Sequence, residues 1–183
     1  MAQKENQRIA LTRRLLQEGL LRLLRHNELE NISVTALCKE AGINRATFYN
    51  HYTSPASLLE EMETQLVAEL KVIGTASSVD EVIIKLEQYC IKLRENAELV
   101  EILVRYHTDK DLEDIVISLT EYYSTYRLDL NQTKLDPETT HLVSTFLYSG
   151  SYSLVREWLI RGIDKSPREI AELMISIISK DYL

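Results

Sequence analysis

The segment INRATFYNHY (residues 43–52) gathers hydrogen-bonding side chains around one small residue, Ala46. If the segment is helical, Phe48 and Tyr52 lie one turn apart on one face, and Ala46 and Asn50 lie on the other. An arginine on such a helix can bond both acceptors of a guanine, and a threonine can bond a base or touch a thymine methyl group. The segment therefore has the chemistry of a helix that reads base edges in a DNA major groove.

A second short helix is expected just before this one, over residues 34–41. Ser33 can cap its start, and Gly42 can supply the left-handed backbone that ends it. Asn44 can then cap the next helix, which is expected over residues 45–52. Two short helices around a glycine-containing turn form the pattern of a helix-turn-helix.

Prolines mark further helix starts. Pro55, Pro137 and Pro167 each follow a serine or an aspartate, which can cap a helix while proline occupies its first turn. Ser78 and Ser166 are each followed three residues later by glutamate, the spacing of a capping box. Because the apolar residues recur at helical spacing, we predict an all-α fold of about nine helices. The expected helices span residues 6–26, 34–41, 45–52, 55–74, 79–94, 97–106, 110–128, 137–161 and 167–180.

The charge is unevenly distributed along the chain. The 183 residues carry a net charge of −7, which by itself argues against binding to a polyanion. However, residues 1–55 hold eight basic and five acidic residues, a net charge of +3, so residues 56–183 carry −10. We therefore expect two domains, a basic three-helix head at residues 1–55 and an acidic helical-bundle body at residues 56–183. Repulsion of the body would help to direct the head toward DNA.

Other classes of protein find no support in the sequence. The two cysteines, Cys38 and Cys90, are too few for a disulfide scaffold and are expected to be small buried residues in a reducing cytoplasm. No apolar run is long enough to span a membrane, and no signal peptide precedes the first helix. The sequence lacks a metal-ligand spacing, a phosphate-binding glycine loop and a nucleophile motif. We expect no metal, no cofactor, no membrane partner and no catalysis.

The segments SVTALCKEAG and INRATFYNHYTSPASLL resemble the DNA-binding domain of TetR-type (TetR/AcrR) transcriptional regulators, over about residues 9–60. This resemblance implies an N-terminal DNA-binding head, a larger C-terminal body that binds an effector and dimerises, and two copies on a palindromic operator. It also implies DNA contacts, with Thr35 at phosphate, the start of the recognition helix at base edges, and the residues after it mostly at phosphate. The implied contact residues are Thr35, Asn44, Arg45, Ala46, Thr47, Tyr49, Asn50, His51, Ser54 and Pro55.

The sequence departs from the family pattern at the start of the helix expected over residues 55–74. The family commonly has lysine there, and this chain has Pro55. A phosphate at that place would rely on the amides and dipole of the helix N-terminus, with help from Ser54.

Tyrosine is unusually common, with ten residues in the chain. Several of them fall in the expected body and could line a pocket for an aromatic or polar small molecule. Alternatively, they pack the helices and the dimer seam, with their hydroxyl groups reaching water. The pocket candidates are Tyr89, Tyr106, Tyr122, Tyr126, Tyr148 and Tyr152.

The last two expected helices carry small and apolar residues suited to close helix packing. The resemblance implies that they form a four-helix seam with their symmetry mates, although a monomer could bury the same stripe internally. The interface candidates are Phe146, Ser149, Ser153, Trp158, Ile170, Met174 and Ile177.

The sequence thus predicts a homodimeric, sequence-specific repressor that an effector releases from a palindromic operator. The alternative is a TetR-like regulator, including an activator, that is controlled by a protein partner, as in the branch associated with dihydroxyacetone kinases. An apolar cavity with a few polar groups in the body would favour the first hypothesis. A closed, fully packed body would favour the second.

Overall fold

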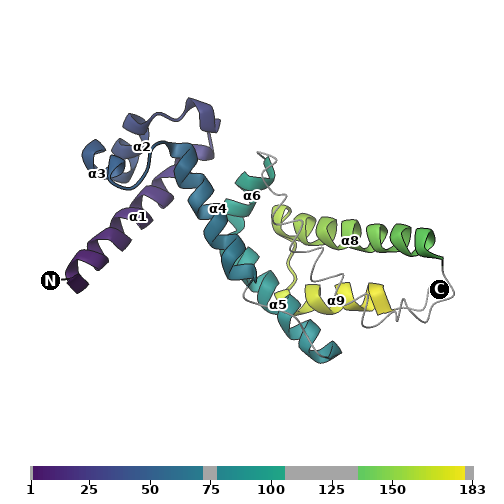
Figure 1. Ribbon diagram of the computed structural model, residues 1–183. Coiled ribbons are helices and arrows are strands. Elements are labelled where there is room, and N and C mark those ends of the chain that lie inside the picture. Colours follow the sequence, from purple (N-terminus) through teal and green to yellow (C-terminus); the bar gives the residue numbers. More distant parts are fainter. Residues whose placement is uncertain (1, 72–77, 106–135, 180–183) are drawn as a thin grey trace. The chain divides into compact units, whose positions relative to one another are not determined.

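A computed structural model describes residues 2–71, 78–105 and 136–179 (Figure 1). These ranges contain eight α-helices and one short 3-10 helix, and no strand is present within them, so the predicted all-α fold is confirmed. The elements are α1 (Ala2–Leu24), η1 (Leu29–Asn31), α2 (Val34–Ala41), α3 (Arg45–Tyr49), α4 (Pro55–Lys71), α5 (Val79–Glu95), α6 (Ala97–Arg105), α8 (Pro137–Ile160) and α9 (Pro167–Ser179). The helix expected over residues 110–128 lies outside the described residues. No helix in the described ranges is both long and apolar enough to cross a membrane.

Helix α3 is shorter than the sequence predicts, because it ends at Tyr49 instead of near residue 52. The backbone N–H groups of His51 and Tyr52 both donate to the carbonyl oxygen of Phe48, at 2.9 Å each. These shared bonds close the helix in a tight turn that leads the chain into α4. Tyr52 is still buried, as the sequence predicts, because this turn keeps its side chain against the core.

The chain forms two compact units, Met1–Leu66 and Val67–Leu183, and the boundary falls within α4. In the first unit α1 packs closely on α2: a Cβ atom added to Gly19 would lie only 3.1 Å from the Cβ of Ala41. An ion pair of 2.6 Å between Arg22 Nε and Glu40 Oε1 joins the same two helices. The core of this unit comprises Leu16, Leu20, Leu24, Ile32, Leu37, Cys38, Ala41, Phe48, Tyr52, Leu58, Leu59, Met62 and Leu66.

The turn between α2 and α3 depends on Gly42. Its φ of 67° and ψ of 26° place it in the left-handed region, and the N–H of Ile43 donates to the carbonyl oxygen of Cys38 at 2.9 Å. This is the glycine-ended helix that the sequence predicts. It fixes the angle at which α3 leaves α2.

We expect the substitution Gly42→Ala to lower the free energy of unfolding by about 1 kcal/mol, because an L side chain is strained in the left-handed region. Nothing lies within 4 Å of an added Cβ, so backbone strain is the whole effect. Urea denaturation followed by circular dichroism measures it. Gly150→Ala is the matched control, because Gly150 lies inside α8 without a positive φ and also has open space around it. An equal response of the two variants would contradict this account of the turn.

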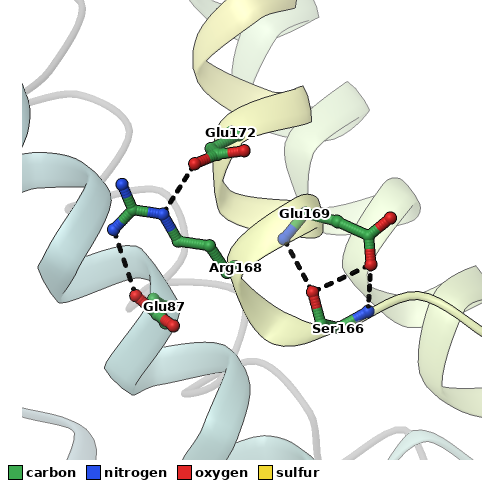
Figure 2. A network of polar contacts seen from close by, with 5 residues as sticks. All are labelled: Glu87, Ser166, Arg168, Glu169 and Glu172. Atoms are coloured by element: carbon green, nitrogen blue, oxygen red, sulfur yellow. Dashed lines mark hydrogen bonds and ion pairs between the residues drawn. The ribbon is translucent and has the colours of Figure 1, made fainter.

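The second unit contains α5, α6, α8, α9 and the last residues of α4. Figure 2 shows Arg168 on α9 between two carboxylates: its Nε lies 2.7 Å from Glu172 and its Nη1 lies 3.2 Å from Glu87 on α5. The indole N–H of Trp158 donates to the carbonyl oxygen of Lys165 at 3.0 Å and ties α8 to the loop before α9. The buried apolar residues described in this unit are Val67, Leu70, Val82, Leu86, Tyr89, Cys90, Leu93, Leu99, Val100, Ile102, Leu103, Val155, Trp158, Ile170, Ala171, Met174 and Ile175.

The predicted helix caps are confirmed. In Figure 2 the Ser166 hydroxyl accepts from the Glu169 N–H at 3.2 Å, while the Ser166 N–H donates to the Glu169 carboxylate at 2.8 Å. The Ser166 hydroxyl also donates to the Glu169 carboxylate at 2.8 Å, and the two bonds donated by Ser166 hold the pKa of Glu169 below its usual range. Ser78 accepts from the N–H of Glu81, and Asp136 caps α8 in the same manner.

Candidate nucleic-acid interface

Helix α3 has one buried face and one exposed face. Asn44 caps it, accepting from the N–H of Thr47 at 2.7 Å, and Phe48 is fully buried. Arg45 and Ala46 are exposed, and so is Asn50 just after the helix. The small side chain of Ala46 leaves room for close approach of a ligand, with hydrogen-bonding groups beside it. The arrangement fits insertion of the exposed face into a major groove.

Arg45 and Tyr49 lie together on this exposed face. The Arg45 guanidinium carbon is 6.0 Å from the centroid of the Tyr49 ring, a cation–π distance. Tyr49 is 52% exposed, and its ring packs edge-on against Phe48 at 5.5 Å between centroids. No carboxylate pairs with Arg45 among the residues that the structure describes. Its charge and its five N–H donors are therefore available for an anion or a base edge.

A polar contact that the sequence did not predict holds Tyr52, in the turn after α3, in place. The Tyr52 hydroxyl donates to Glu61 Oε1 on α4 at 2.9 Å, and the same oxygen lies 3.7 Å from Arg13 Nη1 on α1. Burial, reinforced by the bond to Glu61, raises the pKa of Tyr52. The contact thus joins α1 to Tyr52, just after α3, and to α4. No local spacing signals this contact, since Arg13 and Glu61 are separated by most of the head.

The start of α4 already uses most of its polar groups. The Ser57 hydroxyl accepts from the N–H groups of Thr53 and Ser54 at 3.2 and 3.1 Å, and the Ser57 N–H donates to the Ser54 hydroxyl at 3.1 Å. Pro55 is buried and has no N–H. A phosphate at this place would have to displace these bonds, so Ser54 and Pro55 have the weakest geometry among the predicted DNA contacts.

The remaining predicted contacts lie on the surface of the first unit. Thr35 is exposed in the first turn of α2. His51 is half-buried, with its ring 6.2 Å from that of Tyr52. Thr47 is also half-buried. That these residues touch DNA stays a prediction.

Both cysteines are buried inside helical cores. Burial raises the pKa of the Cys38 thiol, although the nearby Arg45 opposes the effect. Burial raises the pKa of Cys90 to about 12. Both thiols therefore stay protonated at neutral pH, consistent with the prediction that they act as small buried residues.

The tyrosines predicted for an effector pocket fall into two groups. Tyr89 is 1% exposed and Tyr152 is half-buried, and both line a cavity of about 20 Å³ in the second unit. The side chain of Tyr148, together with Tyr106, Tyr122 and Tyr126, lies outside the described residues. The other described residues around the cavity are Leu93, Val100, Val104, Val155, Arg156, Leu159 and Ile160.

The residues predicted for a dimer interface also divide. Trp158, Ile170 and Met174 are 2–3% exposed, so within the chain they pack into its own second unit. Four others lie at the surface of α8 and α9: Phe146, Ser149, Ser153 and Ile177. Phe146 is 75% exposed, and Leu142, one turn earlier, is 65% exposed. An interface would therefore use the outer face of these helices.

Within the described ranges, no three His, Cys, Asp or Glu side chains are placed so that they could bind one metal ion. The exposed chemistry of the first unit is instead that of a cationic, hydrogen-bonding helix face.

Comparison with known families decides the classification. Residues 16–62 match the family described as bacterial regulatory proteins, tetR family, and residues 80–180 match the transcriptional regulator C-terminal region. The chain belongs to the TetR family of transcriptional regulators. It is therefore a DNA-binding regulator, and the TetR head contains the helix-turn-helix described above.

Solved structures show the same fold over nearly the whole chain. A TetR transcriptional regulator from Streptococcus agalactiae is 22% identical, with a TM-score of 0.61 over 97% of this chain and 99% of that one. The dihydroxyacetone kinase operon activator DhaS is 20% identical, with a TM-score of 0.57 over 91% and 93%. The fatty acid degradation regulator FadR from Bacillus halodurans is 12% identical, with a TM-score of 0.61 over 93% and 96%. Among curated protein sequences, none matches significantly.

Proposed function

We propose that this TetR-family protein is a homodimeric repressor that binds a palindromic operator and is released from it by an effector. The observation that carries the proposal is the exposed face of α3, where Arg45 lies beside Tyr49 and pairs with no carboxylate in the described part of the chain. The net charge of +3 over residues 1–55 also favours DNA binding by the part of the chain that carries this face. The protein acts in the cytoplasm and without catalysis.

Within the proposed interface, side chains divide by what they contact. Arg45 and Thr47 read base edges, and Ala46 allows the helix to enter the groove closely. Thr35, Tyr49, Asn50 and His51 contact phosphate and set the register without specifying sequence. Asn44 keeps its capping bond, which leaves its amide N–H groups for DNA.

Release follows from the separation of the two heads. Adjacent major grooves on one side of DNA repeat every 34–36 Å, so both α3 helices bind only when their spacing matches this repeat. An effector that binds more tightly to a dimer with a different head spacing stabilises that state and so lowers the affinity for the operator. The size of the decrease is set by the difference between the effector's affinities for the two dimer states.

The proposed dimer interface lies on the outer face of α8 and α9. We expect Phe146→Glu to convert the dimer to a monomer and to weaken operator binding at least tenfold, because a charge would be buried in the seam. Sedimentation velocity measures the oligomeric state. Ile84→Glu is the matched control, because Ile84 is a surface apolar residue on α5 with 47% exposure. A Phe146→Glu dimer as stable as the parent would refute this interface.

Selection of bound duplexes from a random DNA pool tests the proposed mode of binding. We expect an inverted repeat whose half-site centres are one helical turn or a whole number of turns apart. Enrichment of a single half-site, or of no sequence, would exclude a symmetric dimer on a palindrome.

The second candidate is an activator that is controlled by a protein partner. One observation favours it: the fold matches that of an operon activator, DhaS. Transcription in vitro from a promoter that carries the selected operator separates the two candidates. A repressor lowers the transcript yield on addition of the protein alone, whereas an activator of this kind raises it only when the partner is present.

A further inference from the structure

Glu61 on α4 receives contacts from three directions on one carboxylate oxygen. The Tyr52 hydroxyl donates to Glu61 Oε1 at 2.9 Å, and the Gln65 amide donates to the same oxygen at 3.4 Å. Nη1 of Arg13, on α1, lies 3.7 Å from this oxygen. A single side chain therefore links α1, α4 and the turn that follows α3.

The bond from Tyr52 is the strongest of these contacts. Tyr52 is 5% exposed, and its bond lies within the usual length range for O–H···O and has a charged acceptor. The pair of Arg13 and Glu61 is longer, and their side chains are 42% and 29% exposed, so solvent screens the attraction. The bond from Gln65 is longer than is usual for N–H···O. Loss of the Glu61 carboxylate would therefore act mainly on Tyr52.

Aromatic contacts connect Tyr52 to the exposed face of α3. Its ring lies 5.8 Å from that of Phe48, and the Phe48 ring lies 5.5 Å from that of Tyr49. The Tyr49 ring in turn lies 6.0 Å from the guanidinium carbon of Arg45. Because Phe48 is fully buried and protein interiors are closely packed, the Tyr52 ring cannot shift without displacing Phe48. The place of Arg45 on the exposed face thus depends on where Tyr52 is held.

Helix α3 depends on such contacts because it has only five residues. Helices of this length are not stable by themselves in water, so tertiary contacts must set the orientation of α3. We propose that Glu61 is a positioning residue for DNA binding: it holds Tyr52, and through it α3, in the orientation that fits DNA. Without this bond α3 populates other orientations, and the apparent affinity for DNA falls with the fraction that can bind. The inference rests on one part of the proposed function, namely that α3 is the helix that meets DNA.

The sign of the expected effect separates positioning from simple electrostatics. Removing a negative charge from the head should by itself strengthen binding to a polyanion. If Glu61 positions α3, its removal should weaken binding instead. Glu40 provides the matched control, because its 2.6 Å ion pair with Arg22 also joins two helices of the first unit and its side chain is similarly exposed, at 37%.

The test measures DNA binding by full-length wild type, Glu61→Leu and Glu40→Leu, using fluorescence anisotropy at one fixed salt concentration. We expect Glu61→Leu to bind the selected operator about three- to thirtyfold more weakly than wild type. Glu40→Leu should bind as tightly as wild type or more tightly. A duplex of unrelated sequence is measured alongside, and the loss should appear there too, since α3 meets phosphates on any DNA. The result is therefore independent of whether the duplex selection yields a palindrome.

Two milder variants test the route through Tyr52 and keep the proposal testable if urea denaturation shows that Glu61→Leu does not fold. Glu61→Gln keeps an oxygen that can accept from the Tyr52 hydroxyl, so it should recover most of the affinity that Glu61→Leu loses. Tyr52→Phe removes the hydroxyl and keeps the ring, so its loss should resemble that of Glu61→Leu. The double variant Tyr52→Phe/Glu61→Leu should be no weaker than either single variant, because both remove the same bond.

Three results would each overturn the inference. Glu61→Leu binding as tightly as Glu40→Leu would show that Glu61 does not position α3. Glu61→Gln binding as weakly as Glu61→Leu would show that the charge matters and the bond to Tyr52 does not. Unchanged binding by Tyr52→Phe, or losses that add up in the double variant, would exclude the route through Tyr52.

Discussion

Replacing both Arg45 and Thr47 with alanine is expected to abolish the preference for operator over unrelated DNA. Each side chain is placed on or beside the exposed face of α3 by the capped turn at Asn44. Each specific base contact contributes about 1–3 kcal/mol of discrimination, so the pair should cost roughly 30-fold to 10⁴-fold in specificity. Fluorescence anisotropy with selected and scrambled duplexes at one fixed salt concentration measures the ratio.

The matched control removes the same two residue types from the second unit. Thr145 and Arg161 lie on and just after α8, and both are exposed. The double variant Thr145→Ala/Arg161→Ala should keep the operator preference of the parent. Retained preference in the α3 double variant would instead show that these two side chains do not read the operator.

The second large effect is expected from Phe48→Ala. Phe48 is fully buried, and its ring contacts those of Tyr49 and Tyr52 at 5.5 and 5.8 Å between centroids. Removing it leaves a cavity under the recognition helix at a cost of about 3–5 kcal/mol. We expect the head to unfold at a much lower urea concentration and binding to every duplex to be lost, not only binding to the operator.

Its neighbour Tyr49 provides the contrast, because it is 52% exposed. Tyr49→Ala should change the unfolding free energy by about 0.5 kcal/mol or less, while weakening all duplexes similarly through a lost phosphate contact. The three variants in α3 thus separate sequence reading, phosphate binding and folding. A Phe48→Ala protein with the urea midpoint of the parent would contradict the packing of the head.

Much of the fold follows from local signals. The caps at Asn44, Ser78 and Ser166 were predictable because a capping side chain and the N–H it serves lie two or three residues apart. The turn at Gly42 was predictable because only its backbone conformation, not a distant partner, selects the residue. The end of α3 was less predictable, since the turn that closes it competes with continued helix at similar energy.

The sequence by itself determined the helical class, the order of the helices and the helix-turn-helix of the regulator. Helical periodicity and helix caps depend on residues that are close in sequence. The difference in net charge between residues 1–55 and the rest can be counted directly from the sequence. Only the tertiary structure decided which polar groups meet. It joined Tyr52 to Glu61 and Arg13, and it left the Tyr89 hydroxyl without a hydrogen-bond partner among the described residues. These outcomes depend on how whole helices pack, and packing energy is shared among many distant residues that no local pattern records.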